Sequence, residues 1–311
     1  MFSTIKLKAL PLFIASAALA VLLSTSAYAK HRIQDSDGEK ILAEIPQRVA
    51  ALNWDIAEQV IELGITPVAV PDIKGYNEWV VQPAIPEGAK DIGTRTEPNF
   101  SALRKLNPDV ILIASPQKDL EKRLSDIAPV LYYQTYSEDH NNAEAAMENF
   151  RRIGQALGRE AVAEEKLSQM ESRFAELNKL LDKAYPDGRP EVTSFRFAST
   201  SSVYLYGDNS IPQYALEKLG LKNAMPQPVT QWGISQQRIT KLSKIGDGVA
   251  LYFEPFPYTK KLKKLAAWNS MPFVKAKRVN SVAPSWSYGG AMSILYNGEA
   301  LAEAMLELAE K

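Results

Sequence analysis

The sequence predicts an α/β protein built as two α/β lobes bridged by a single long helix. Residues 160–185 contain no Pro or Gly and are rich in Ala, Leu, Glu and Lys, which cost little free energy in a helix. On each side lie roughly 110 to 130 residues in which short apolar runs, typical of strands, alternate with helical patterns. A helix of about 25 residues spans roughly 37 Å, which is long enough to connect two lobes.

The apolar residues of this helix recur at intervals of three to five, so they form one stripe between charged flanks. Gly158 precedes the helix, and the Pro186-Asp187-Gly188 turn ends it. The alternative is an ordinary surface helix of one larger domain. The predicted stripe consists of Val162, Leu167, Met170, Phe174, Leu177 and Leu181.

The two blocks beside the helix resemble each other, and this similarity favours a bridge between lobes. Each contains, in the same order, a strand, a helix that ends in Leu-Gly, and a later apolar run typical of a buried strand. Such a repeat predicts a pseudo-duplicated molecule with a cleft between its lobes. The matching segments are 48–52, 62–65 and 110–113 in the first block, and 191–197, 218–221 and 249–253 in the second.

The chain begins with the pattern of a secretory signal peptide. Lys6 and Lys8 precede an almost entirely apolar run, residues 9–23, and Ala27-Tyr28-Ala29 forms an A-x-A cleavage site. Cleavage after Ala29 is expected to release 282 of the 311 residues. The predicted division is a signal peptide at 1–29, an N-terminal α/β lobe at 30–158, the bridging helix at 159–186 and a C-terminal α/β lobe at 187–311.

In the N-terminal lobe, strands and helices are expected to alternate after a polar lead-in at residues 30–46. Asn99 is expected to cap one of the helices, since a side-chain oxygen there can accept from the first turn. Residues 72–79 are predicted to form a loop that contains Trp79. The predicted strands are 48–52, 68–70, 110–114 and 130–133, and the predicted helices are 54–63, 100–106, 120–127 and 143–157.

The C-terminal lobe is expected to start with a strand over 191–197, where Val192, Ser194 and Arg196 share one face. A hairpin around residues 200–202 leads to the next strand, 203–206. A polar loop over 227–235 follows and contains Trp232. A further strand at 249–253 and a C-terminal helix after residue 290 complete the lobe.

Charge and composition exclude several kinds of function. Without Lys6 and Lys8, 34 basic groups face 36 acidic ones, which argues against a nucleic-acid partner and gives no reason to expect membrane-surface binding. The absence of Cys excludes a thiol nucleophile, a cysteine metal site and a lipid-carrying Cys, so the protein is expected to be free in the periplasm. His31 and His140 are the two histidines and are expected to be solvated. Neither common nucleotide-binding glycine motif occurs.

Aromatic residues and one arginine follow the predicted strands, where α/β lobes bind their ligands. Aromatic walls with a few polar groups describe a pocket for a small molecule. Packing in the core is the alternative for each Trp taken singly, and Trp268, which lies in a helical pattern, is assigned to it. The candidate ligand-binding residues are Trp54, Trp79, Arg95, Trp232, Trp286 and Tyr288.

Several motifs give the chain a resemblance to a known family. Residues 91–99, Asp-Ile-Gly-Thr-Arg-Thr-Glu-Pro-Asn, are similar to a motif of periplasmic ferric-hydroxamate-binding proteins, the FhuD-like branch of the class III substrate-binding proteins of ABC importers. The resemblance covers nearly the whole chain after residue 29. Its other marks are the segments 51–54, 231–233, 268–273 and 286–289, together with the Trp79 segment.

The resemblance implies the class III fold, with a ferric siderophore bound in a shallow cleft. It implies that Arg95 hydrogen-bonds the charged hydroxamate oxygens, a role suited to a guanidinium, which keeps its proton. Trp54, Trp79 and Trp232 would pack on the apolar linkers of the siderophore, and Trp286 and Tyr288 would close the second side. The siderophore ligates the iron, so no cofactor and no protein metal ligand are expected. The implied partner is an inner-membrane ABC permease, and a monomer is expected.

Two departures from the family pattern, and one further arginine, concern the ligand and the permease. Ser115-Pro116-Gln117 stands where the family often has a tyrosine. Arg196 is expected near the cleft, where a second cation would suit an acidic siderophore such as a citrate-hydroxamate; a solvated strand face is the alternative. The two glutamates that dock related proteins on the permease are replaced by Ser101 and Gln237, so Glu97 and Glu121 become the candidate docking residues.

Other ligands and one other class of function stay open at this stage. Haem, a cobalamin or a carboxylate siderophore would suit the same fold. Haem is disfavoured because neither histidine lies in a predicted cleft loop, although a tyrosine could ligate it. A periplasmic hydrolase would need a nucleophile and a base, and no pair of residues in the sequence suggests one. The protein is therefore expected not to be an enzyme.

Overall fold

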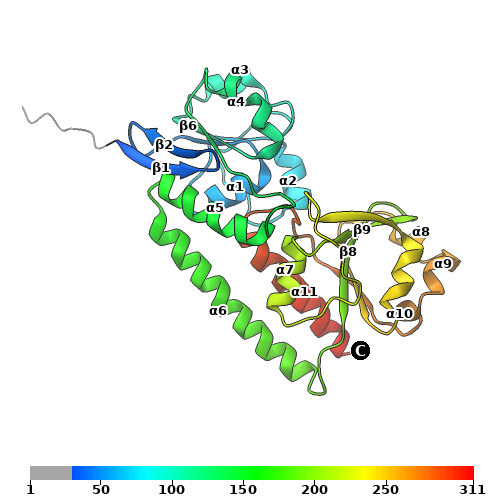
Figure 1. Cartoon of the computed structure of the whole chain (residues 1–311). Helices are drawn as coiled ribbons and strands as arrows, with labels where there is room; N and C mark the ends of the chain where they lie inside the picture. Colours follow the sequence, from blue (N-terminus) through cyan, green and yellow to red (C-terminus); the bar gives the residue numbers. More distant parts are fainter. Residues whose placement is uncertain (1–29) are drawn as a thin grey trace, which may run out of the picture.

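A computed structural model describes residues 30–311, and the predicted signal peptide lies outside them. Two five-stranded sheets, each covered by helices, form two lobes, and the long helix α6 (Glu160–Ala184) runs beside both (Figure 1). The predicted fold class is confirmed. The exact lobe boundaries, 30–158 and 187–311, remain a prediction.

The first sheet is entirely parallel and has the strand order β5-β4-β3-β6-β7. Helices cover both faces, so the central strands are buried apolar runs without alternation. The strands are β3 (Val49–Ala51), β4 (Ala69–Val70), β5 (Lys90–Asp91), β6 (Val110–Ile113) and β7 (Val130–Tyr132). The helices are α1 (Trp54–Glu62), α2 (Ile73–Trp79), α3 (Phe100–Lys105), η1 (Ser115–Leu120), α4 (Glu121–Leu124) and α5 (Asn142–Ala156).

The second sheet repeats this order as β10-β9-β8-β11-β12, but β9 lies antiparallel to both of its neighbours. A tight hairpin joins β8 to β9, and such a short connection cannot make the crossover that α1 makes in the first lobe. The strands are β8 (Val192–Phe197), β9 (Ser202–Tyr206), β10 (Ile234–Arg238), β11 (Val249–Phe253) and β12 (Val279–Val282). The helices are α7 (Ile211–Lys218), η2 (Ile239–Ile245), α8 (Thr259–Leu262), α9 (Ala266–Asn269), α10 (Pro272–Lys275) and α11 (Ala291–Ala309).

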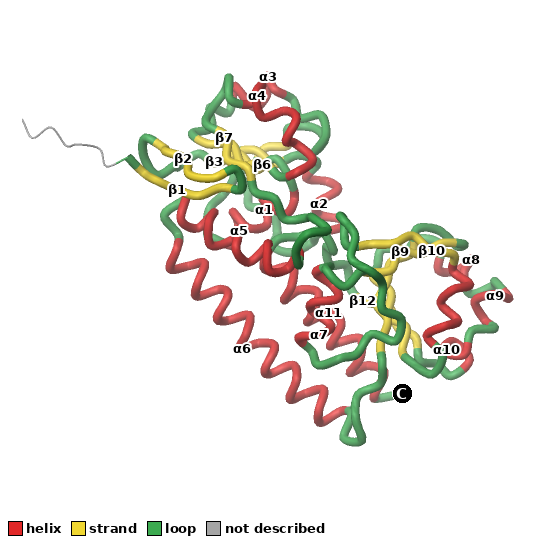
Figure 2. Tube along the Cα trace, viewed as in Figure 1, coloured by secondary structure: helices red, strands yellow, loops and turns green. Residues whose placement is uncertain are grey.

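Helix α6 packs along α5 of the first lobe and α11 of the second (Figure 2). Its buried stripe matches the predicted one except at its start, where Ala163 is buried and Val162 is half-buried. Gly298 of α11 allows the close approach, because a Cβ there would lie 2.4 Å from the Phe174 ring. The apolar core is continuous from β3 and β6 of the first lobe, through these helices, to β8 and β11 of the second.

Three local predictions are wrong. Residues 30–46, predicted as a lead-in, contain a hairpin of β1 (His31–Asp35) and β2 (Gly38–Leu42), whose Ile33 and Leu42 are buried. Residues 72–79 form α2 rather than a loop, because the Asp72 carboxylate accepts from Gly75 N at 3.1 Å and starts the helix. The predicted helix 120–127 is instead η1 followed by the single turn of α4.

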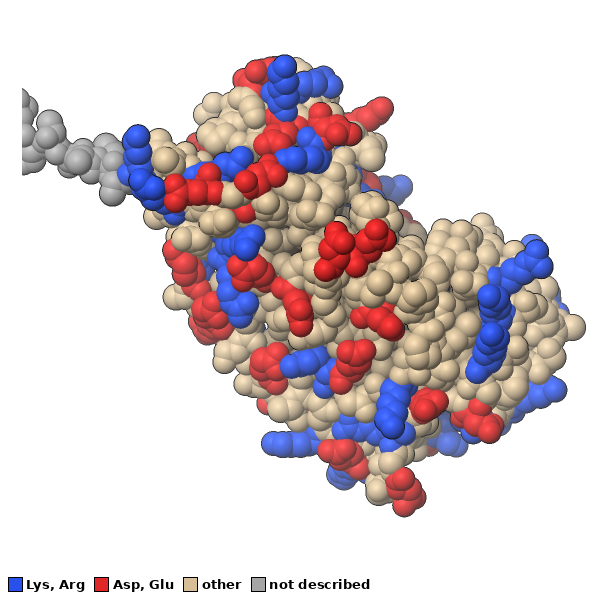
Figure 3. Space-filling view, viewed as in Figure 1, with Lys and Arg blue, Asp and Glu red and all other residues tan. Residues whose placement is uncertain are grey.

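The surface carries charges of both signs. On the face shown in Figure 3, acidic and basic side chains are interspersed along α6, where Arg173 forms a 2.7 Å ion pair with Glu299 of α11. Among residues 30–311, no helix combines the length and the apolar character needed to cross a membrane.

Candidate ligand-binding site

A pocket of about 220 Å³ lies between the lobes, at the carboxyl edge of the first sheet. Asn53 follows β3 and Pro116 follows β6, the two strands at which the strand order reverses, a usual place for ligand sites in open α/β sheets. A larger hollow of about 550 Å³ lies near Gln47 and Gly64, at the amino edge of this sheet. The lining of the interlobe pocket is Asn53, Arg95, Pro116 and Tyr136 from the first lobe, and Trp232, Trp286 and Tyr288 from the second.

The loop that carries Arg95 is held by its own motif residues. Asp91 accepts hydrogen bonds from Gly93 N and Ile73 N, both at 2.8 Å, and Thr94 Oγ1 accepts from Glu97 N at 3.0 Å. Gly93 adopts a φ of 92°, a left-handed conformation that favours glycine. Asp91, Gly93 and Thr94 thus each have a structural role in holding the loop that carries Arg95.

Gln117 also holds this loop. Its Nε2 donates to the Arg95 carbonyl oxygen at 2.9 Å, and its Oε1 accepts from Ala114 N at 3.3 Å. Gln117 is fully buried, so its side chain does not face the pocket as a ligand-binding group would. Where the family often has a tyrosine, this chain therefore has a residue that positions the Arg95 backbone.

The Arg95 guanidinium lies over the Trp54 ring, 3.8 Å from its centroid, and 5.8 Å from that of Trp286. Within residues 30–311 it has no ion pair and donates no side-chain hydrogen bond. Burial lowers the pKa of Arg95, while Asp72 and Asp55 act in the opposite direction. Because a guanidinium stays protonated in proteins, its donors are available to an anionic ligand.

The predicted aromatic residues lie together, but only part of them line the pocket. Trp232 is 42% exposed at its rim, whereas Trp286 is 8% exposed. Trp54 is buried, and its Nε1 donates to Pro71 O at 3.1 Å, so it supports Arg95 from below. Trp79 lies beside Trp286, with ring centroids 6.4 Å apart, outside the pocket lining. Trp268 is buried in the core of the second lobe, as predicted.

Tyr136 lines the pocket but was not among the ligand-binding residues predicted from the sequence. Its hydroxyl donates to Gly289 O at 2.7 Å, and its ring contacts Trp232 and Tyr288, with centroids 6.2 and 5.6 Å away. It follows β7 by only a few residues, so its position after a strand was an available signal. The contacts themselves join segments about 100 to 150 residues apart, which no local pattern records.

Arg196 lies on the same side of the cleft as Trp286. Its guanidinium carbon is 5.5 Å from the Trp79 ring centroid, 5.3 Å from that of Tyr204 and 6.0 Å from that of Trp286. Burial raises the pKa of Tyr288, and the positive charge of Arg196 partly offsets this. Arg196 is therefore half-buried among these rings rather than on a solvated strand face, although it is not one of the residues that line the pocket.

Buried carboxyl groups below the pocket were also missed. Asp55 and Glu58 are fully buried on α1, and neither was among the residues singled out from the sequence. Burial raises the pKa of Asp55 to about 6, although hydrogen bonds from Asn53, Ile56 and Thr135 act to lower it. Burial likewise raises the pKa of Glu58 to about 8, although hydrogen bonds from Ser293 and Gly290 act to lower it.

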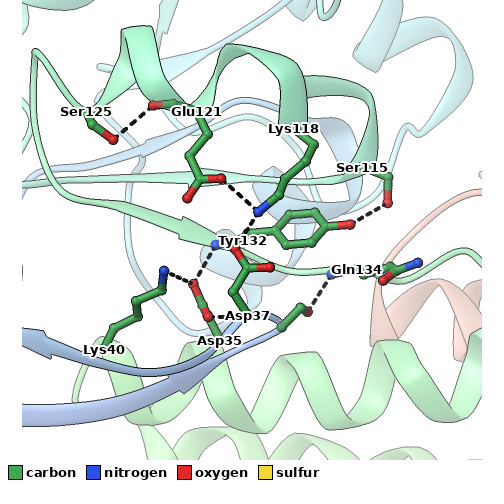
Figure 4. Close-up of polar contacts among 10 residues, drawn as sticks. Asp35, Asp37, Lys40, Ser115, Lys118, Glu121, Ser125, Tyr132 and Gln134 are labelled. Atoms are coloured by element: carbon green, nitrogen blue, oxygen red, sulfur yellow. Dashed lines mark hydrogen bonds and ion pairs between the residues drawn. The ribbon is translucent and has the colours of Figure 1, made fainter.

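The two candidate docking acids differ in their surroundings. Glu97 is exposed and has no ion pair within the described part of the chain. Glu121 is half-buried and pairs at 2.7 Å with Lys118, which also pairs with Asp37 and lies over the Tyr132 ring (Figure 4). The charge of Glu121 is therefore partly neutralised by Lys118, and the ion pair of Lys118 with Asp37 ties the β1–β2 hairpin to the lobe.

The histidines bind backbone carbonyl groups away from the pocket. His31 Nε2 donates to Gln155 O at 3.0 Å, and His140 Nε2 donates to Thr135 O at 2.9 Å. Over residues 30–311, no group of three or more His, Asp or Glu side chains is arranged to hold a metal ion.

Comparison with known proteins shows which family this arrangement belongs to. Residues 49–243, well over half of the chain, match the sequence model of the periplasmic binding proteins. The chain belongs to this family.

Two members of the family, both named FhuD, are similar to this periplasmic binding protein over most of its length. FhuD of Vibrio cholerae, in its structure with Fe3+–Desferal, is 51% identical, with a TM-score of 0.82 over 84% of this chain and 98% of that one. The iron(3+)-hydroxamate-binding protein FhuD of Escherichia coli (strain K12) is 28% identical over 254 residues, 81% of this chain and 84% of that protein. The resemblance to the FhuD-like branch is confirmed.

More distant members share the fold. The triscatecholate siderophore binding protein FeuA of Bacillus subtilis is 21% identical, with a TM-score of 0.71 over 89% of this chain and 99% of that one. The class III fold of two bridged lobes is thus common to the group.

Proposed function

We propose that this periplasmic binding protein captures a ferric siderophore with hydroxamate iron ligands and delivers it to an inner-membrane ABC importer. The observation that carries the proposal is the Arg95 guanidinium, which lies over Trp54 at a pocket with aromatic walls and has no side-chain acceptor among residues 30–311. The two FhuD relatives, one named for iron(3+)-hydroxamate binding and one solved with Fe3+–Desferal, support this choice of ligand class.

The chemistry of the site suits such a ligand. Hydroxamate oxygens on Fe3+ carry negative charge, and a guanidinium offers them several fixed donors in one plane. Trp232, Trp286 and Tyr288 would pack on the apolar linkers of the siderophore, as Tyr136 would from the first lobe. The siderophore supplies all ligands of the iron, so the protein recognises the complex from outside. We propose that the protein only binds and releases its ligand and catalyses no reaction.

The proposal includes a periplasmic location, a monomeric state and a docking residue for the permease. The predicted signal peptide would bring the chain to the periplasm, where a single protomer would suffice because the pocket is formed within one chain. Of the candidate docking acids, exposed Glu97 is the better placed to meet a cationic permease surface, since Glu121 already pairs with Lys118.

A tryptophan-fluorescence titration of residues 30–311 tests the ligand class. The panel comprises linear and cyclic ferric hydroxamates, a ferric citrate-hydroxamate, a ferric catecholate and haem. Trp232 and Trp286 lie at the pocket, so bound iron chelate should quench emission. We expect saturable quenching at micromolar or lower concentration by the hydroxamates alone. A response to haem or to the catecholate without one to any hydroxamate would keep the fold and overturn the ligand.

A further inference from the structure

Arg95 and Arg196 differ from the other half-buried arginines of this protein. Six arginines among residues 30–311 are half-buried. Four of them form ion pairs with carboxylates, at distances of 2.6 to 2.9 Å. The paired four are Arg152, Arg173, Arg189 and Arg278, and the two without an ion pair are those at the cleft.

Arg196 is held in place without a hydrogen-bond or ion-pair acceptor among the residues that the structure describes. Its strand β8 belongs to the second lobe, and its guanidinium is surrounded by rings from both lobes, Trp79 from the first and Tyr204 and Trp286 from the second. Such cation–π contacts orient the group but leave its N–H donors unsatisfied. Partial burial of an unpaired cation costs free energy, because the charge loses water. An anion that pairs with the cation offsets this cost, so binding of the anion is favoured.

The two cations converge on the same ring from opposite lobes. The Arg95 and Arg196 guanidinium carbons lie 5.8 and 6.0 Å from the Trp286 ring centroid. A ligand whose iron-bound oxygens face Arg95 would therefore extend past Trp286 toward Arg196. A neutral ferric trihydroxamate has no second anionic group to offer there, whereas a siderophore with a free carboxylate has one.

Resting on the proposed function, we infer that Arg196 is a specificity-determining residue that binds a free carboxylate carried by the ferric siderophore. A guanidinium and a carboxylate can form two parallel hydrogen bonds, which reward this group in one orientation. The preferred ligand is then an anionic hydroxamate siderophore, such as a citrate-hydroxamate, over a neutral or cationic one.

The test uses two ferric trihydroxamates that differ in one group. One chelator ends in a free carboxylate, and the other is the same chelator with that end converted to a primary amide. Both are titrated into the mature protein and into Arg196→Gln, Arg196→Lys and Arg238→Gln, the last an exposed control on β10. We expect the wild-type protein and the control to favour the carboxylate ligand by about tenfold, the worth of one hydrogen-bonded charge pair.

Arg196→Gln should abolish this preference while affinity for the amide ligand changes by less than about twofold. Arg196→Lys should keep part of it, because the charge remains. Equal wild-type affinity for both ligands would overturn the inference and leave the proposed function standing. A similar loss for both ligands in Arg196→Gln would also overturn it, since the residue would then act through its contact with Trp79. Failure of the wild-type protein to bind either chelate would overturn the proposed function as well.

Discussion

Glu58 of α1 accepts hydrogen bonds from Ser293 of α11 with both carboxylate oxygens. Ser293 N donates to Oε1 at 2.7 Å, and the Ser293 hydroxyl donates to Oε2 at 2.6 Å. Gly290 N donates to the same Oε2 at 2.9 Å. Gly290 occupies the N-cap position and has no side chain to cap the helix, so a residue of the first lobe caps a helix of the second. A Cβ at Gly289 would lie 1.7 Å from Ser293 Oγ and 2.6 Å from Glu58 Oε2, so the same contact leaves room only for a glycine there.

Replacing Glu58 should destabilise the whole protein. Glu58→Ala leaves two buried amide groups of α11 without an acceptor, so the free energy of unfolding should fall by about 2–4 kcal/mol. Urea unfolding followed by tryptophan fluorescence measures this. Glu58→Gln, which keeps one acceptor, should lose less, and Glu87→Ala, an exposed site, should lose almost nothing. A Glu58→Ala variant as stable as that control would show that the cap is dispensable.

Asp55 should make stability fall as pH rises through weakly acidic values. Its pKa is raised from 3.8 to about 6 by burial, so the folded protein holds a proton that the unfolded chain releases between these values. The unfolded state binds fewer protons in this window, and the free energy of unfolding therefore decreases from pH 3.8 toward pH 6. Asp55→Asn should remove this part of the pH dependence, measured by urea unfolding at several pH values. Asp187→Asn, at an exposed turn, should leave the wild-type slope, and an unchanged slope in Asp55→Asn would refute the assignment.

Arg95 should be the main polar determinant of affinity. If its guanidinium holds the charged oxygens of the siderophore, Arg95→Ala should weaken binding by about 1.5–3 kcal/mol, the range for hydrogen bonds to charged groups. The fluorescence titration measures the change, and a thermal melt verifies folding. Arg104→Ala, an exposed arginine of α3, serves as the matched control. Unchanged affinity in Arg95→Ala would remove this residue from the site.

Gln117 should act on the ligand through Arg95. Gln117→Ala removes the hydrogen bond to the Arg95 carbonyl oxygen, and we expect a loss of about 1 kcal/mol in binding as the loop becomes less ordered. A double-mutant cycle decides whether the effect is indirect. In the Arg95→Ala background, Gln117→Ala should cause almost no further loss. Fully additive losses would mean that Gln117 affects the ligand by another route.

The lobes should close only slightly when ligand binds. The core continues through both lobes, and Glu58 joins α1 to α11, so a wide rotation would break buried contacts. Because the chain has no Cys, Ser101→Cys with Lys241→Cys provides two exposed labelling sites, one in each lobe. Energy transfer between dyes there should report a change of a few ångström on saturation. A change as large as a helix diameter, about 10 Å, would contradict this expectation.

Local sequence patterns were sufficient for the elements that depend on near neighbours. The apolar spacing of residues 160–185 predicted α6, because a helix brings residues three and four apart onto one face. Residues 91–99 were recognised by their resemblance to a family motif, and the hydrogen bonds that hold this segment join residues close in sequence, such as Asp91 and Gly93. The arrangement of strands and helices in two bridged lobes followed from the same kind of local periodicity.

Features that depend on contacts between distant segments could be seen only in the tertiary structure. Glu58 lies within a helix that was predicted from local periodicity, yet α11, more than 230 residues later, buries it and supplies its donors. Tyr136 meets Gly289 in the same way, and Arg196 meets Trp79 across the cleft. Whether a polar side chain is solvated or buried depends on which element packs against it, and periodicity within one segment carries no information about that partner. The positions of most helices, α2 and α4 excepted, were therefore predictable from the sequence, whereas the joint between the lobes and the place of Arg196 beside Trp79 and Trp286 were set by packing.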